Sequence, residues 1–219
     1  SVESGELYAT ELRHPLVERI VALEGKTYVA NDVTLNPLNC WMLYGVNSVG
    51  KSSLLKSIII NVILAQSGMF VAANSFVFNP FHVIGCRIGN NDDIFYGQSS
   101  FVKAALEMDL IFRKAMKSPS LIITDEMCSS TETTSALKVI SSFIQILSER
   151  RITFACATHL FELQDNKYIC GLKNIKNCHL SVDFKEDVLV FTRKLKDGLP
   201  SCQNYGVMVA KTMIHDNRF

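Results

Sequence analysis

The sequence predicts an α/β domain with a mostly parallel central sheet, and three features indicate this fold class. Short apolar runs that suit buried strands alternate with longer stretches whose apolar residues recur at helical spacing. One apolar run is followed by a glycine-rich turn, and another ends in two acidic residues. The 219 residues, 48% of them hydrophobic, suffice for one large core and are too few for two ordinary domains.

The alternation is clearest from residue 40 to residue 157. Strands are expected at 40–44, 81–88, 121–124 and 152–157, and helices at 51–67, 101–117 and 133–150. Segments 178–184 and 188–192 predict an antiparallel hairpin at the edge of the sheet. We therefore expect helices to flank the sheet on both sides.

The first part of the chain reads differently. Short extended runs at 26–30 and 32–35, broken by Pro15, Gly25 and Pro37, predict a small N-terminal β layer over residues 1–38. Residues 39–219 would then form the core and end in a C-terminal helix. Because the chain starts at Ser1 without a basic-then-apolar leader, no targeting signal can be read, and we expect a piece of a longer protein.

Composition excludes several classes of function. A net charge of +1 argues against electrostatic binding of nucleic acid along the whole chain. The seven cysteines form no C-x-x-C pair, and their odd number predicts a reducing intracellular compartment. The sequence leaves open whether this is the cytoplasm, the nucleus, a mitochondrion or a viral factory. The longest apolar stretch, residues 58–65, falls short of the roughly 20 residues that span a bilayer, so no membrane partner is expected.

The glycine-rich turn has the pattern G-x-x-x-x-G-K-S at residues 45–52 and lies between an expected strand and an expected helix. Such a phosphate-binding loop (P-loop) wraps phosphates with backbone N–H groups, and the helix N-terminus faces their charge. Lys51 is expected to reach the β- and γ-phosphates of ATP, and Ser52 to ligate Mg²⁺. The predicted nucleotide-binding residues of the loop are Gly45, Asn47, Ser48, Gly50, Lys51, Ser52 and Ser53.

Two further segments place polar groups where strands end. The run at 121–124 delivers Asp125 and Glu126 to the carboxyl end of its strand, the edge at which open α/β sheets bind ligands. Asp125 is expected to hold Mg²⁺, and Glu126 to polarise the attacking water. The run at 152–157 leads to His159, which could sense the γ-phosphate or position that water. Glu126 and His159 are therefore the predicted catalytic residues.

The order of these and other motifs resembles the ATPase domain of the MutS family of DNA mismatch-recognition proteins. Besides the P-loop, the matching segments are RHPLVE at 13–18, YVAND at 28–32, DDIFYGQSSF at 92–101, ATHLFEL at 157–163 and NYGVMVA at 204–210. The resemblance implies a P-loop ATPase of ABC-ATPase-like architecture. It further implies that Tyr28 stacks on adenine and that Ser99 acts in trans on the nucleotide of a homodimer partner. Mismatched double-stranded DNA would be bound by domains outside this chain.

The chain also departs from the common pattern of that family. After Asp125 and Glu126, Cys128 and the pair Thr131 and Glu132 resemble the branch known from large DNA viruses and coral mitochondria. Ser130 stands where that branch tends to keep glycine, Ala104 replaces an acidic residue, and Phe161 replaces a common histidine. These changes bear on turnover and subunit coupling and leave the nucleotide-binding motifs intact.

Other classes of function compete with this interpretation. A transporter or chromosome-organising ATPase would show L-S-G-G-Q before the carboxylates, whereas this chain has GQSS at 97–100. A nucleotide-gated binding module with impaired hydrolysis is compatible with Ala104 and Ser130, but the presence of Lys51, Asp125, Glu126 and His159 argues against it. A small-molecule kinase is least favoured, since no lid or acceptor-binding segment is apparent.

Overall fold

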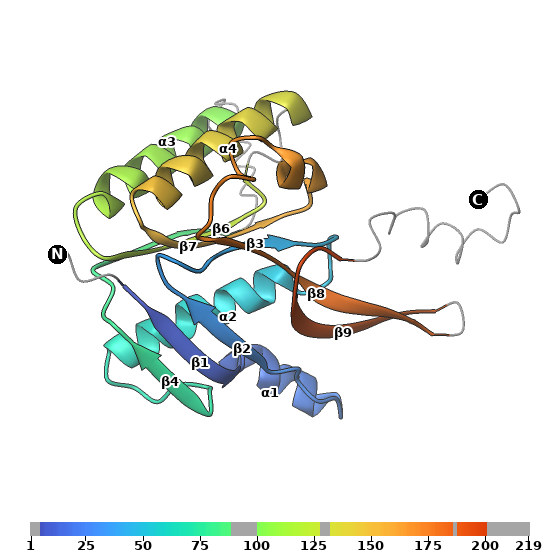
Figure 1. The fold of residues 1–219 in the computed structure, drawn as a ribbon. Helices are drawn as coiled ribbons and strands as arrows, with labels where there is room; N and C mark the ends of the chain where they lie inside the picture. Colours follow the sequence, from blue (N-terminus) through green and yellow to red (C-terminus); the bar gives the residue numbers. More distant parts are fainter. Residues whose placement is uncertain (1–4, 89–99, 128–131, 186–187, 201–219) are drawn as a thin grey trace, which may run out of the picture.

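A computed structural model describes residues 5–88, 100–127, 132–185 and 188–200. Two sheets and their flanking helices make up the fold (Figure 1). The elements are β1 (Leu7–Leu12), α1 (Pro15–Leu23), β2 (Asn31–Leu35), β3 (Cys40–Tyr44), α2 (Lys51–Gln66), β4 (Ser75–Phe78), β5 (Val83–Arg87), α3 (Ser100–Ala115), β6 (Ser120–Asp125), α4 (Thr133–Glu149), β7 (Thr153–Thr158), the 3-10 helix η2 (Phe161–Asp165), β8 (Ile175–Lys185) and β9 (Val188–Asp197).

The larger sheet has six strands in the order β5-β6-β7-β3-β8-β9. Every neighbouring pair from β5 to β8 is parallel, and β9 closes the edge as the antiparallel partner of β8. This confirms the predicted α/β class, the mostly parallel sheet and the edge hairpin. β3, β6 and β7 are buried at every position, as expected for central strands covered on both faces.

The two faces of this sheet are covered by different layers (Figure 1). Helices α3 and α4 lie on one face, while α2 and the smaller sheet lie on the other. Side chains alternate between the faces: Trp41 and Leu43 pack toward α2, whereas Met42 and Tyr44 pack on the α4 side. Because β5, β6, β7, β3 and β8 are parallel, their carboxyl ends meet at one edge of the sheet.

The N-terminal layer differs in detail from the expectation. The small sheet, ordered β2-β1-β4, takes β4 from beyond α2, so residues 1–38 do not form it alone. Lys26 to Ala30 lie outside any strand. Pro15, which the sequence suggested as a break, instead begins α1. The first N–H groups of a helix have no partner within the helix, so the missing N–H of proline loses no hydrogen bond there. His14 caps the helix, because its Nδ1 accepts a hydrogen bond from Val17 N at 3.3 Å.

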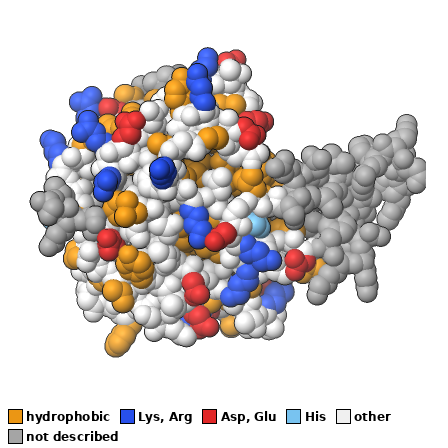
Figure 2. Space-filling model, viewed as in Figure 1, with side chains coloured by type: hydrophobic (Ala, Val, Ile, Leu, Met, Phe, Trp, Pro, Cys, Tyr) orange, Lys and Arg blue, Asp and Glu red, His pale blue; other side chains and the backbone are white. Residues whose placement is uncertain are grey.

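The structure also bears on the sequence expectations about membrane spans, the C-terminal helix and surface charge. The described residues contain no helix long and apolar enough to cross a membrane. The C-terminal helix expected around 205–210 lies outside the described residues. On the face shown in Figure 2, charged side chains of both signs are interspersed with apolar patches, in keeping with the small net charge.

Candidate functional site

The carboxyl edge of the parallel sheet brings together most of the residues singled out in the sequence. β7 connects these residues, because it lies between β3 and β6 and its last carbonyls accept hydrogen bonds from the residues that follow both strands. Gly45 N donates to Thr158 O at 3.3 Å, and Glu126 N donates to Ala157 O at 3.0 Å. These main-chain bonds tie the turn after β3, the acidic pair at the end of β6 and the end of β7 into one site.

The turn between β3 and α2 has a backbone that few residues adopt. Gly50, the N-cap of α2, has φ +112° in the left-handed region, which only glycine enters without strain. Ser48 also has positive φ, +68°. No side chain caps the N-terminus of α2, so its first N–H groups face the turn without a side-chain acceptor. Asn47 and Ser48 lie exposed on the turn.

Lys51 crosses the concave side of this turn. Its ammonium donates to Gly45 O at 2.7 Å and to Val46 O at 2.9 Å, and it lies 3.8 Å from Glu126 Oε1. The side chain is 4% exposed. Burial lowers its pKa, while the charges of Glu126 and Asp125 act in the opposite direction. A buried cation is therefore held against the carbonyl oxygens at the start of the turn.

Asp125, at the end of β6, lies 6% exposed beside the start of α2. Burial raises the pKa of its carboxyl, although a hydrogen bond with the Ser52 side chain and the charge of Lys51 oppose that shift. Within the described part of the chain, Asp125 Oδ1 is buried and has no hydrogen-bond partner. A carboxylate oxygen left unpaired beside a serine hydroxyl fits Mg²⁺, which prefers hard oxygen ligands.

Glu126 is held in a strained conformation next to Asp125. Its φ of +51° lies in the left-handed region, where a non-glycine residue costs about 1–3 kcal/mol. Its side chain is 24% exposed, with Oε1 at 3.6 Å from His159 Nδ1. His159 is 44% exposed. The structure thus places the two predicted catalytic side chains next to each other, with Glu126 also next to Lys51.

A pocket of about 300 Å³ opens beside this turn, between α1, the start of α2 and the β8–β9 hairpin. Tyr28, Gly50 and Ser53 line it, so the structure brings Tyr28 to the site. Tyr28 is half-buried; burial raises the pKa of its phenol, and hydrogen bonds with the Ser53 side chain and the His14 backbone oppose the shift. The sequence had suggested a ring in an extended strand, but Tyr28 lies in the connection between α1 and β2.

Sequence reasoning missed Arg193, which lines the same pocket from β9. Its φ is +56°, next to an irregularity in the β8–β9 register. Asn31 fixes this irregularity: Asn31 Nδ2 donates to Arg193 O at 3.1 Å, and Asn31 Oδ1 accepts from Leu195 N at 2.7 Å. The segment 188–192 predicted a hairpin strand, but nothing in its alternation marked the bulge that directs Arg193 toward Gly50.

Several sequence predictions cannot be placed. Ser99, Cys128 and Ser130 lie outside the described residues, as does most of the segment 92–101. α3 begins at Ser100, one residue before the expected start, and its described side chains begin at residue 105. Gly45, Lys51, Ser52, Ser53, Asp125, Glu126, His159 and Tyr28 are the predicted residues that the structure gathers around one edge.

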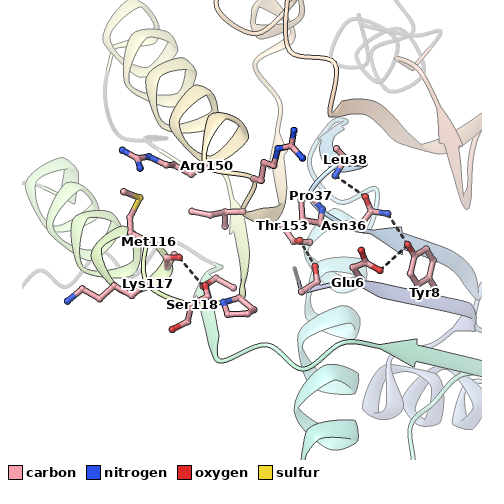
Figure 3. A pocket seen from close by; sticks show the side chains of 16 residues that line it. Glu6, Tyr8, Asn36, Pro37, Leu38, Met116, Lys117, Ser118, Arg150 and Thr153 are labelled. Atoms are coloured by element: carbon pink, nitrogen blue, oxygen red, sulfur yellow. Dashed lines mark hydrogen bonds between the residues drawn. The ribbon is translucent and has the colours of Figure 1, made fainter. Parts of the chain in front are cut away.

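A second hollow, of about 550 Å³, lies at the opposite edge of the sheet, where β6 and β7 begin. Figure 3 shows Arg150 and Lys117 on one side and a chain of hydrogen bonds through Glu6, Tyr8 and Asn36 on the other. Both cations follow the ends of α4 and α3, where the helix dipole favours positive charge. Their helix positions account for them, and this hollow contains none of the residues predicted to bind ligand.

The chain is similar in sequence to proteins of known family. Residues 41–217 match the family described as MutS domain V. The chain is 36% identical over 218 residues to a mitochondrial DNA mismatch repair protein mutS homolog of Sarcophyton glaucum, covering 98% of this chain and 21% of that protein. It is 32% identical to a mutS homolog of Acanthamoeba polyphaga mimivirus, over 97% of this chain and 22% of the other. The DNA mismatch repair protein MutS of Caldanaerobacter subterraneus is 35% identical, over 92% and 23%. The chain therefore spans about a fifth of the length of these relatives.

Proposed function

The chain belongs to the MutS family of DNA mismatch repair proteins, as its domain V, and from that premise we propose that it binds and hydrolyses ATP at the carboxyl edge of its parallel sheet. The observation that carries the proposal is the buried ammonium of Lys51. It lies against the Gly45 and Val46 carbonyls, within 3.8 Å of Glu126, at the N-terminus of a helix that no side chain caps. A buried cation at the N-terminus of a helix without a side-chain cap suits a polyphosphate.

Each residue of the edge has a role in this proposal. The N–H groups of residues 47–52 would hold the phosphates, with Lys51 turning from the carbonyls toward the β- and γ-phosphates. The Tyr28 ring and Arg193 would hold the base in the 300 Å³ pocket beside Gly50. Glu126 would accept a proton from the attacking water, and His159 would orient that water or contact the γ-phosphate.

Ser52 and the unpaired Asp125 oxygen would hold Mg²⁺. When bound, the metal supplies charge neutralisation for the phosphates. The chain's own contribution is a buried carboxylate, that of Asp125, joined by a hydrogen bond to the exposed Ser52 side chain.

The assembly is part of the same proposal. Two copies of this domain would pair through the nucleotide edge, with Ser99 of one copy serving the nucleotide of the other, and regions outside this chain would bind mismatched DNA. If the site is shared, specific activity should rise across a micromolar dilution series. Ser99→Ala mixed with Lys51→Ala should restore at most one working composite site per pair. Specific activity that stays flat, with light scattering showing only monomer, would mean that one chain suffices.

Equilibrium binding of labelled ATP tests the central assignment. Lys51→Ala should abolish tight binding, because it removes the cation aimed at the phosphates. Lys117→Ala is the matched control, since it removes a lysine from the opposite edge of the same sheet. Unchanged affinity in a folded Lys51→Ala variant would refute the assignment of the turn.

A further inference from the structure

The segment that carries His159 leaves the sheet at Thr158 and has few ties to it. Leu160 N donates to Thr158 Oγ1 at 3.0 Å, and His159 Nδ1 lies 3.6 Å from Glu126 Oε1. Nearly half of the imidazole is exposed. The position of His159 therefore depends on what holds the next residues, which form η2 (Phe161–Asp165).

One ring contact joins η2 to the strand that precedes the glycine turn. Phe161, two residues after His159, stacks on Tyr44, with ring centroids 6.0 Å apart and an interplanar angle of 21°. Tyr44 is the last residue of β3, is fully buried, and pairs in register with Thr158 of β7. Leu163, also fully buried, anchors the next turn of η2 in the same apolar cluster.

The Tyr44 ring, rather than its hydroxyl, makes this contact. Within the described residues, Tyr44 Oη is buried without a hydrogen-bond partner, and burial raises the pKa of this phenol above its ordinary range. A buried hydroxyl without a hydrogen-bond partner costs free energy. The hydroxyl of Tyr44 therefore does not explain why a tyrosine occupies this position. An offset pair of stacked rings adds about 0.5–1.5 kcal/mol beyond burial.

We propose that the Tyr44–Phe161 ring stack is a positioning device, which fixes His159 beside Glu126 and couples it to the strand that bears the glycine turn. Tyr44 adjoins Gly45, and Phe161 follows His159 by two residues, so the stack links the two loops of the site through side chains as β7 links them through the main chain. The inference rests on the proposed function for its effect on hydrolysis. Its structural part concerns the ligand-free chain alone.

Phe161→Leu tests this in the ligand-free protein by hydrogen exchange. Exchange at the Leu160 amide should accelerate by about tenfold, because η2 loses its anchor, while the Gly45 amide should keep its wild-type rate. Phe143→Leu is the matched control: Phe143 is equally half-buried and pairs with Phe112 at 6.5 Å on the same face of the sheet, between α3 and α4. Phe161→Met provides a milder variant if Phe161→Leu does not fold. Tyr44→Phe should behave as wild type.

With ATP, Phe161→Leu should lower kcat by about tenfold while the ATP Kd changes less than about twofold, since misplacing a group costs rate rather than binding. The losses from Phe161→Leu and His159→Asn should be non-additive, because both act through one imidazole. Leu160 exchange equal in wild type and Phe161→Leu, or equally fast in Phe143→Leu, would overturn the proposal. A wild-type chain that binds no ATP would refute the proposed function, while the exchange comparison would still decide the role of the ring stack.

Discussion

The two edges of the parallel sheet are built from the same strands but satisfy their polar groups very differently. Five described residues have a buried side-chain nitrogen or oxygen without a hydrogen-bond partner, and four of them, Tyr44, Arg87, Thr124 and Asp125, end or nearly end a parallel strand at the carboxyl edge. At the opposite edge the buried hydroxyls are paired: Thr153 Oγ1 donates to Gly5 O, and Ser120 Oγ donates to Ser118 O, both at 2.6 Å.

The two edges also differ in whether their charged side chains are buried. Lys51 and Asp125 are buried at the carboxyl edge, whereas Lys117, Arg150 and Arg151 at the opposite edge are exposed. Positive φ does not separate the edges, since Ser48 and Glu126 have it at the carboxyl edge and Arg151 has it at the opposite edge. Buried polar atoms without a hydrogen-bond partner and buried charge reduce stability, and their concentration on one side supports the proposal that a ligand binds there. The predictions below test that contrast.

Glu126→Gln should give the largest effect. The amide keeps the shape of the side chain but cannot accept the proton of water, so hydrolysis should fall by at least about a hundredfold while ATP binding persists. Single-turnover phosphate release measures the rate, and Glu149→Gln at the end of α4 is the control. A near-wild-type rate would move the catalytic role to another residue.

Thr153→Val, at the opposite edge, should change stability and not ATP binding. The valine leaves Gly5 O without its 2.6 Å donor, a loss of about 1–3 kcal/mol in the free energy of unfolding. Urea denaturation measures this loss, and labelled ATP should bind as it does to wild type. Weakened ATP binding in the folded variant would show that the two edges are not independent.

Tyr28→Ala should weaken ATP binding by about tenfold, because the pocket loses the ring that lines it. Tyr28→Phe should weaken ATP binding by less than about threefold, although it removes the hydroxyl that bonds to the Ser53 side chain and the His14 backbone. Equilibrium binding to the two variants separates ring from hydroxyl. An equal loss in both would assign the hydroxyl a structural role in place of adenine stacking.

Asp125→Asn should change the pH dependence of stability in the absence of metal. Burial raises the folded pKa of Asp125 above the ordinary value of 3.8, so wild type should lose stability as the pH rises from 3.8 through that raised value. The asparagine variant should lack this contribution and be more stable than wild type above that range. Thermal unfolding across the pH series checks the sign, and a wild-type curve that gains stability there from Asp125 would contradict it.

The sequence predicted most of the carboxyl edge because its signals are local. Gly50 needs positive φ, Lys51 follows it, and Asp125 ends an apolar strand, so each can be read within a few residues. Arg193 could not be found in this way, because its position depends on a bulge fixed by Asn31 from another sheet. β4 joined the small sheet by pairing with β1 across more than 60 residues, which no local pattern encodes.

The same limit applies within the candidate site. Phe161 was marked only as a departure from a family pattern, and its contact with Tyr44 depends on β3 and β7 being neighbours. α1 was missed because Pro15 was read as a break, although proline is well suited to the first position of a helix. Ser99, Ser130 and the expected C-terminal helix remain sequence predictions, since they lie outside the described residues.

Isothermal titration of the wild-type chain with ATP, in Mg²⁺ and again in EDTA, tests the central claim most directly. The proposed site predicts saturable binding of one ATP per chain in Mg²⁺ and weaker binding in EDTA, because Ser52 and Asp125 then hold no metal. A folded chain that gives no binding heat and no displacement of labelled ATP at millimolar concentration would contradict the claim that the carboxyl edge is a nucleotide site.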